Sequence, residues 1–152
     1  VVDDIVSESL RHIDRRSAEH HITVDCGDVP LLVRVDAGLI MQVLINLVNN
    51  AVKYTPAGSN IRITAIRRGN AAEICVSDDG PGIPDELKER VFEMFFTGGN
   101  PIGDSRRSLG LGLTLCQAIL HAHNGEMTLK DNSPQGCIFS FTVPLSEVNL
   151  NE

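Results

Sequence analysis

Residues 46–58 read NLVNNAVKYTPAG. This stretch joins apolar residues at helical spacing to a stop signal of proline and glycine. Its polar and aromatic side chains follow one another at separations of four, three and one residues, which places them on one side of a helix: Asn46, Asn50, Lys53 and Tyr54. The opposite side is apolar and carries Ile40, Leu44, Leu47, Val48 and Ala51.

Carboxamides are costly to bury without hydrogen-bond partners. The polar side of this helix therefore has two interpretations. In one, it is simply exposed to solvent. In the other, a carboxamide oxygen binds a hard cation and the lysine amine binds a phosphate.

Upstream of this stretch, Asp36 is a suitable N-cap for a helix that runs to Tyr54. Residues 1–19 have apolar positions at i, i+3 and i+4 and predict an amphipathic helix. Between them, apolar and polar residues alternate at 22–24 and 33–35, which predicts two short strands around Pro30.

Downstream, alternation at 61–65 and 74–78 about a turn at 68–70 predicts a hairpin, and a second hairpin is expected from 127–129 and 138–143. A short helix is expected at 85–90, and a polar, glycine-rich loop follows at 97–108 (TGGNPIGDSRRS). A further helix is expected at 110–123. This order predicts an α+β two-layer sandwich, with helices on one face of a mixed sheet.

Composition excludes several classes of protein. The 152 residues suit one domain, and the net charge of −7 argues against a nucleic-acid partner. No apolar run reaches the roughly 18–20 residues that span a bilayer. The four cysteines form no C-x-x-C pair and are expected to be free thiols. Because the chain opens at Val1, we expect a fragment of a longer protein.

A second polar cluster follows the first hairpin, in VSDDGPGIP at 76–84. Asp78 lies on the same strand face as Ile74 and Val76, so it is expected to point toward the core, where a carboxylate needs donors. A purine amino group is one such donor. Gly80 and Gly82 would let the backbone pass close to a ligand. The alternative is an ordinary tight turn.

A third feature is Gly110-Leu111-Gly112-Leu113, a glycine pair at the predicted start of a helix. Free N–H groups and the helix dipole suit a phosphate there. The pair lacks the preceding strand of a Rossmann fingerprint, and the chain has no Walker A motif.

Taken in order, NLVNNAVKYTPAG, VSDDGPGIP, VFEMFF (91–96) and LGLGLTLCQAILHAHNGEM (109–127) resemble the N, G1, F and G2 boxes of the GHKL ATPase superfamily. The closest resemblance is to the catalytic ATP-binding domain of bacterial sensor histidine kinases, in particular the Kdp-type potassium and osmosensing kinases. The resemblance covers about residues 20–144. It implies a Bergerat fold, with a mostly antiparallel sheet of about five strands, three main helices on one face and an ATP lid.

The resemblance also implies roles for individual residues. Asn50 would bind Mg²⁺, and Asn46, Asn50 and Lys53 would be the catalytic residues around metal and phosphates. Asp78 would accept a hydrogen bond from the adenine amino group. Residues 97–108 would form the lid. The remaining ATP-binding positions would be Tyr54, Gly80, Gly82, Ile83, Phe95, Thr97, Arg106, Arg107, Gly110, Leu111, Gly112 and Leu113.

Three positions depart from the family pattern. Thr97 stands where an arginine or lysine is usual, Ser108 replaces a glycine, and Cys137 replaces a threonine whose hydroxyl could bond near the base. Arg106 or Arg107 could substitute for the missing lid cation.

The predicted function is a protein histidine kinase domain that takes ATP and Mg²⁺ and phosphorylates a histidine on an upstream dimerisation domain, for relay to a response-regulator aspartate. Residues 1–19 would continue from that domain, residues 20–145 would bind ATP, and residues 146–152 would be a tail. The parent protein would be a homodimer anchored in the bacterial inner membrane, with this chain on the cytoplasmic side.

Two alternatives remain open. In hydrolytic relatives a glutamate that activates water stands at the position of Asn46, and an amide cannot take that proton. This argues against hydrolysis and for transfer to a nucleophile that needs no activation. A GHKL-type ATP hydrolase nevertheless stays as the first alternative, and a degenerate, non-catalytic interaction module is the second.

Overall fold

The computed structural model describes residues 1–12, 20–27, 31–53, 55–56, 58–80, 107–132 and 135–146. The side chains of Lys53 and of residues 107–112 are not among those described. The elements follow the chain as α1 (Val2–Leu10), β1 (His21–Asp25), α2 (Ala37–Lys53), β2 (Asn60–Arg68), β3 (Ala71–Asp78), α4 (Arg107–Ala122), β4 (Met127–Asp131) and β5 (Cys137–Pro144).

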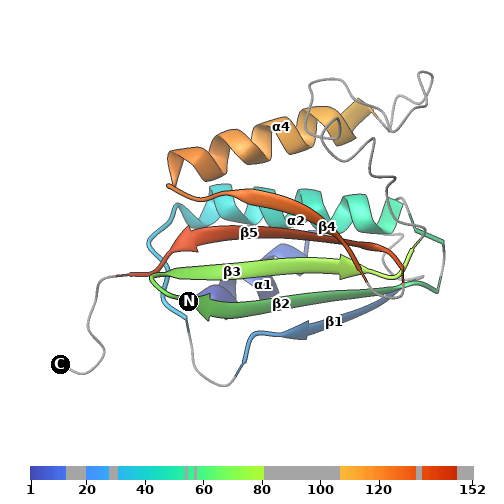
Figure 1. The fold of residues 1–152 in the computed structure, drawn as a ribbon, viewed down its shortest axis with the longest axis horizontal. Coiled ribbons are helices and arrows are strands. Elements are labelled where there is room, and N and C mark those ends of the chain that lie inside the picture. Colours follow the sequence, from blue (N-terminus) through green and yellow to red (C-terminus); the bar gives the residue numbers. More distant parts are fainter. Residues whose placement is uncertain are drawn as a thin grey trace.

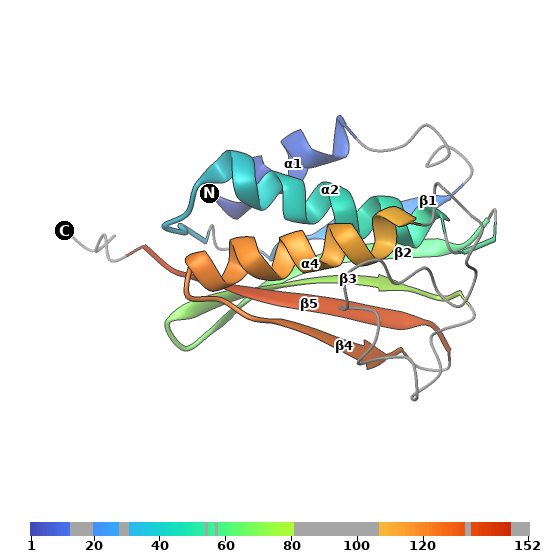
Figure 2. The ribbon, with the colours of Figure 1, turned by 90° about the horizontal axis from the view of Figure 1, so that it is seen from above.

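The strands form one sheet in the order β1-β2-β3-β5-β4 (Figure 1). Strands β1 and β2 are parallel, and the other neighbours are antiparallel. Burial alternates along β3, where Ala72, Ile74, Val76 and Asp78 face inward and are buried. The helices α1, α2 and α4 cover that face (Figure 2). The two-layer sandwich with a mixed sheet is therefore confirmed.

The core lies between α2, α4 and the sheet. Its largest fully buried side chains include Phe141 from β5, Leu44 and Leu47 from α2, and Leu113 and Leu120 from α4. Burying each of these side chains contributes about 1.5–3 kcal/mol. The hydrophobic stripe predicted for α2 is thus the stripe that packs on the sheet. None of the four cysteines forms a disulfide, as predicted.

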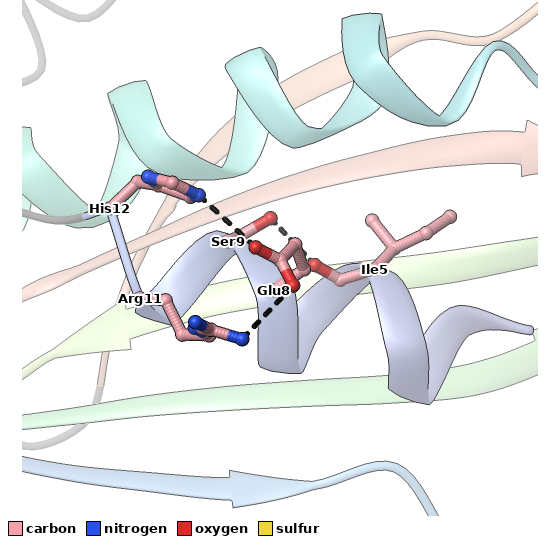
Figure 3. Close-up of polar contacts among 5 residues, drawn as sticks. All are labelled: Ile5, Glu8, Ser9, Arg11 and His12. Atoms are coloured by element: carbon pink, nitrogen blue, oxygen red, sulfur yellow. Dashed lines mark hydrogen bonds and ion pairs between the residues drawn. The ribbon is translucent and has the colours of Figure 1, made fainter.

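Helix α1 is shorter than predicted. It ends at Leu10, where Arg11 N–H donates to Glu8 O and His12 N–H donates to Ser9 O, and these i to i−3 bonds close the last turn. Glu8 pairs with Arg11 at 3.6 Å and with His12 at 3.1 Å, and Ser9 Oγ donates to Ile5 O (Figure 3). Residues 13–19 lie outside the described part of the chain.

The strand predicted at 33–35 is also wrong. Only Val33 forms an isolated bridge, and its partner is Leu145. Backbone bonds from Arg34 N–H to Pro144 O and from Ser146 N–H to Leu32 O flank this bridge. The segment is therefore extended, but it pairs with the end of β5 for too short a distance to make a strand.

The first turn of α2 and the last turn of α4 lie at the end of the molecule away from the C-terminal end of β3 (Figure 1). A histidine connects them there by a hydrogen bond. Asp36 caps α2 as predicted, because its Oδ1 accepts the N–H of Leu39 at 3.1 Å. The Asp36 N–H donates to His123 Nε2 at 3.1 Å, and His123 Nδ1 lies 2.7 Å from Ile119 O. The ring therefore has its proton on Nδ1, and both ring nitrogens have structural partners.

Candidate functional site

Helix α2 carries Asn46 and Asn50 toward its C-terminal end. Asn46 is half-buried, and Asn50 is buried at 6% exposure. The exposed-face interpretation is therefore wrong for Asn50. Its Nδ2 atom has no hydrogen-bond partner among the residues that the structure describes. Because an unpaired buried amide costs about 1–3 kcal/mol, a polar ligand at this position would recover that cost.

Asp78 ends β3 on its inward face, as predicted from the alternation with Ile74 and Val76, and it is 8% exposed. Its Oδ1 accepts the N–H of Gly80 at 3.0 Å and the N–H of Cys137 at 3.3 Å. Burial raises the pKa of the Asp78 carboxyl, these two hydrogen bonds oppose the rise, and the charge of Asp79 adds to it. Within the described part of the chain, no donor reaches Oδ2.

The Cys137 position keeps a bond to Asp78 despite lacking the hydroxyl of the family pattern. The bond comes from the Cys137 backbone N–H rather than from its side chain. A backbone donor is independent of residue type, so the change to cysteine leaves this contact in place.

The β4–β5 turn holds the peptide that follows β3, which the sequence did not indicate. Asn132 Nδ2 donates to Asp78 O at 2.8 Å, and Gln135 Nε2 donates to Asp79 O at 3.1 Å. Gly136 has a φ of +112°, and a Cβ there would overlap the Asp78 carbonyl oxygen. Only glycine combines this conformation with so close an approach. The one available signal was Gly136 itself, which lies between the two expected strands of the second hairpin.

Asp79 has a different role from Asp78. Its carboxylate accepts the Asn60 N–H and the Asn60 Nδ2 amide, each at 2.8 Å. These bonds lower the pKa of the Asp79 carboxyl and keep it ionised. Asn60 begins β2 and neighbours the Ile61↔Asp78 pair, so this contact continues the register beyond the strands. Asp79 therefore links the two strands at the open end of the β2–β3 hairpin, opposite its turn.

The C-terminal end of α2 touches the turn that follows β3. Thr55 Oγ1 donates to Ala51 O at 2.6 Å and lies 2.9 Å from His20 Nε2. Because the hydroxyl proton is used on Ala51, the ring nitrogen is the donor to Thr55. The Thr55 methyl lies against Gly80, where a Cβ would come within 2.5 Å of it. The glycine is thus required for contact between the two segments.

Helix α4 begins earlier than predicted, at Arg107 rather than Gly110. Arg107 and Ser108, assigned to the lid in the sequence, are therefore helical. The unpaired N–H groups belong to the first turn of a helix, so here they lie around Arg107, and Gly110–Leu113 are already inside the helix. Leu113 is fully buried. Nothing in the sequence of 107–109 breaks a helix, so α4 extends through it.

Three of the four quoted segments reach the same end of the molecule. The C-terminal ends of α2 and β3, the start of α4 and the start of β5 all lie toward that end in both views (Figures 1 and 2). Other expected site residues and the helix at 85–90 lie outside the described residues: Tyr54, Gly82, Ile83, Phe95, Thr97 and Arg106. Of Lys53, Arg107, Gly110, Leu111 and Gly112 only the helical backbone is described.

None of the helices in the described part of the chain is both long and apolar enough to span a membrane.

The chain is similar to several characterised proteins. Sensor protein KdpD of Clostridium acetobutylicum is 36% identical over 144 residues, covering 95% of this chain and 16% of that protein. Adaptive-response sensory kinase SasA of a Nostoc species is 40% identical over 119 residues, covering 78% of this chain and 29% of the kinase. The chain therefore spans less than a third of the length of either relative.

Solved structures agree with these relatives. The catalytic domain of histidine kinase ThkA superposes with a TM-score of 0.80 at 30% identity, covering 94% of this chain and 91% of that domain. ThkA in complex with the response regulator protein TrrA gives a TM-score of 0.78 at 29% identity, covering 95% of this chain and 40% of the kinase chain.

The match to a protein family covers most of the chain. Residues 35–147 match the family described as histidine kinase-, DNA gyrase B- and HSP90-like ATPases. That match includes α2, the hairpin that ends at Asp78, and α4. ATP is the substrate of this family. The chain belongs to the histidine kinase-, DNA gyrase B- and HSP90-like ATPases, and within that family to the ATP-binding catalytic domains of histidine kinases.

Proposed function

We propose that this chain binds Mg-ATP and donates the γ-phosphoryl group to a histidine on another domain of its parent protein. In that step the imidazole nitrogen forms a bond to phosphorus, the bond to the bridging oxygen breaks, and ADP leaves. Relay to an aspartate of a response regulator would follow, as the ThkA–TrrA complex suggests by similarity. The parent would be a dimer anchored in the membrane, with this chain on the cytoplasmic side, where ATP is available.

The observation that carries the proposal is the orientation of Asp78. Two backbone N–H groups hold Oδ1, and among the described residues no donor reaches Oδ2. An ionised carboxylate is only an acceptor, so this oxygen suits the exocyclic amino group of adenine. The buried position strengthens such a bond because solvent screens it less.

Asn50 fits a role in holding Mg²⁺. Its carboxamide is buried, and its Nδ2 donor, which is unpaired within the described part of the chain, would face a phosphate oxygen while its oxygen faces the cation. A carboxamide oxygen is a ligand that hard cations accept, and Mg²⁺ commonly takes its other ligands from substrate phosphates and water. The cation would neutralise phosphate charge. Asn46 lies one turn earlier on the same helix and would contact the metal or its water, and Lys53, the last residue of α2, would contact a phosphate.

The side chain at position 46 favours transfer over hydrolysis. An asparagine cannot remove a proton from water at neutral pH, whereas a neutral imidazole needs no such activation. An ATP hydrolase therefore remains the less favoured candidate. Steady ATP turnover by this chain that is lost in Asn46→Ala would support it.

A thermal-shift titration tests nucleotide binding. Mg-ATP at 100 times its dissociation constant adds about 2.7 kcal/mol to the free energy of unfolding. We expect that shift in the natural sequence and its loss in Asp78→Asn, because the amide presents a donor or is free to rotate. No shift in the natural sequence would support the non-catalytic module instead.

Incubation with Mg-ATP and a separately made acceptor domain tests the transfer. We expect acid-labile phosphohistidine on that domain and none on this chain. A chain that binds Mg-ATP but never labels the acceptor domain would contradict the kinase role.

A further inference from the structure

The carbonyl group of Asp78 contacts the β4–β5 hairpin, which lies more than 50 residues further along the chain. Asn132 Nδ2 donates to Asp78 O at 2.8 Å, and the backbone of Gly136 packs directly against the same carbonyl. The Asn132 N–H donates to Gly136 O at 2.9 Å, which closes the turn between β4 and β5. The two residues that contact the Asp78 carbonyl are therefore bonded to each other.

The same hairpin also holds the Asp78 side chain. One of the two donors to Oδ1 is the N–H of Cys137, the first residue of β5. The orientation of the carboxylate thus depends on the peptide plane that Asn132 fixes and on the strand that follows Gly136. Rotation of the peptide between Asp78 and Asp79 would break the Asn132 contact and would displace the Gly80 N–H, the other donor to Oδ1.

We propose that Asn132 is a positioning residue that sets the selectivity of this site for adenine over guanine, acting through the Asp78 carboxylate. The inference rests on the proposed function, because it assumes that Asp78 binds the base. Adenine presents an amino donor at the position where guanine presents a carbonyl acceptor. A carboxylate held in one orientation favours the donor and repels the acceptor.

The loss of the Asn132 amide frees the Asp78 peptide to rotate. The carboxylate then spends part of its time turned away from the base, which weakens adenine binding. The same rotation weakens the repulsion between the carboxylate and the guanine carbonyl, so guanine binding loses less or improves. The effect is therefore on the ratio of two affinities, whereas a merely structural defect weakens both nucleotides equally.

The experiment measures dissociation constants for Mg-ADP and Mg-GDP by calorimetry in the natural chain and in variants. We expect Asn132→Ala to weaken ADP binding about three- to tenfold, the range given by the loss of one hydrogen bond. Binding of GDP should be unchanged or stronger, so the ADP-to-GDP preference falls by at least that factor. Asn132→Asp keeps the side-chain size but cannot donate, and it should behave as Asn132→Ala does.

The matched control is Asn70→Ala, at the exposed turn at the other end of the β2–β3 hairpin. It should leave both affinities unchanged. Gln135→Ala provides a second comparison, because this exposed side chain donates to Asp79 O rather than to Asp78. It should alter the preference by less than about twofold, since an exposed hydrogen bond contributes little.

The outcomes separate the inference from the proposed function. If the natural chain binds neither nucleotide, the proposed function fails. If it prefers ADP and Asn132→Ala retains the full preference, or loses ADP and GDP affinity by the same factor, the positioning role is overturned.

If the variants do not fold, a measurement on the natural chain still tests the positioning role of Asn132. The NMR signals of the Asn132 side-chain amide should shift on addition of ADP but not of inorganic triphosphate. Unchanged signals at saturating ADP would overturn the inference.

Discussion

Asn50 illustrates a conflict between stability and function at a single residue. Its buried amide nitrogen lacks a partner among the described residues, so the folded chain bears a desolvation cost. Sites that bind ligands commonly retain such costs because the ligand relieves them. The position is therefore expected to be suboptimal for the stability of the chain without nucleotide.

We expect Asn50→Leu to stabilise the nucleotide-free chain by about 1 kcal/mol, because an apolar side chain of similar size removes the unpaired group. The same change should abolish the Mg²⁺-dependent part of the thermal shift with ATP. Gln42→Leu, at an exposed position of the same helix, should change stability by less than about 0.5 kcal/mol. Urea unfolding measures both, and a destabilised Asn50→Leu chain would contradict the argument.

The buried Asp78 carboxyl predicts a pH dependence of base binding. Burial raises its pKa above the ordinary 3.8. Adenine binding needs the carboxylate, so affinity for adenosine should fall as the pH is lowered through this raised pKa. Adenosine is the suitable probe because it has no phosphate that titrates. The affinity of Asp78→Asn should be weaker and should change only as the adenine ring itself takes up a proton, and a natural chain with the same profile as this variant would exclude the carboxylate from the site.

The raised pKa of Asp78 affects the stability of the fold in the opposite direction to its effect on adenine binding. The folded chain keeps the Asp78 proton to a higher pH than the unfolded chain does. The contribution of this group to stability is therefore full below 3.8 and is lost as pH rises through the folded pKa. Asp79 behaves inversely, because its lowered pKa gives stability that is present above 3.8 and lost as pH falls through the folded pKa.

At the scale of elements, two glycines at the ends of helices differ in the space around their Cα atoms. A Cβ at Gly125, between α4 and β4, would overlap the Thr142 carbonyl oxygen of β5. A Cβ at Gly38, in the first turn of α2, would meet only the Asp36 carboxylate at ordinary contact distance. The two positions therefore offer a matched pair.

We expect Gly125→Ala to destabilise the chain by about 2 kcal/mol or more, because backbone must move to admit the methyl group. Gly38→Ala should instead stabilise it by up to about 1 kcal/mol through better helix propensity. Thermal unfolding of both variants tests the pair. Equal effects at the two positions would contradict the packing at Gly125.

The elements that the sequence predicted well are those with local signals. The β2–β3 hairpin and α2 carry periodicity, an N-cap and a stop signal within themselves. The failed strand at 33–35 has a distant cause, because the bridge at Val33 is made with Leu145, at the other end of the chain. The early start of α4 had no sequence signal, because the glycine pair looked like the start of the helix.

The same distinction holds for the candidate site. Asp78 was predicted because alternation along its own strand turns it inward. The contact between Asn132 and Asp78 was not predicted, because it depends on the order of strands in the sheet. β5 lies next to β3 and β4 lies next to β5, which brings residue 132 to the end of β3. No pattern near residue 132 shows which carbonyl group its amide reaches.

At the scale of the whole molecule, an acidic chain of net charge −7 is expected to bind a polyanion. Long-range repulsion should slow the approach of ATP unless a cation accompanies it. Screening at high salt removes that repulsion, since the Debye length falls from about 30 Å at 0.01 M to about 3 Å at 1 M.

We therefore expect Mg-ATP to associate several-fold faster than metal-free ATP at about 0.01 M salt, and the two rates to converge to within about twofold at 1 M. Stopped-flow fluorescence with a labelled nucleotide measures both rates. A rate ratio that does not change with salt would show that local groups, rather than the net charge, control the approach.

The bond between the Asp36 amide and the His123 ring has a mechanical consequence for the whole domain. It fastens the beginning of α2 to the end of α4, whereas Asn50 and Arg107 stand near the opposite tips of these helices. Loss of this bond, as in His123→Ala, would therefore loosen the contact between the two helices at the end of the domain opposite to Asn50.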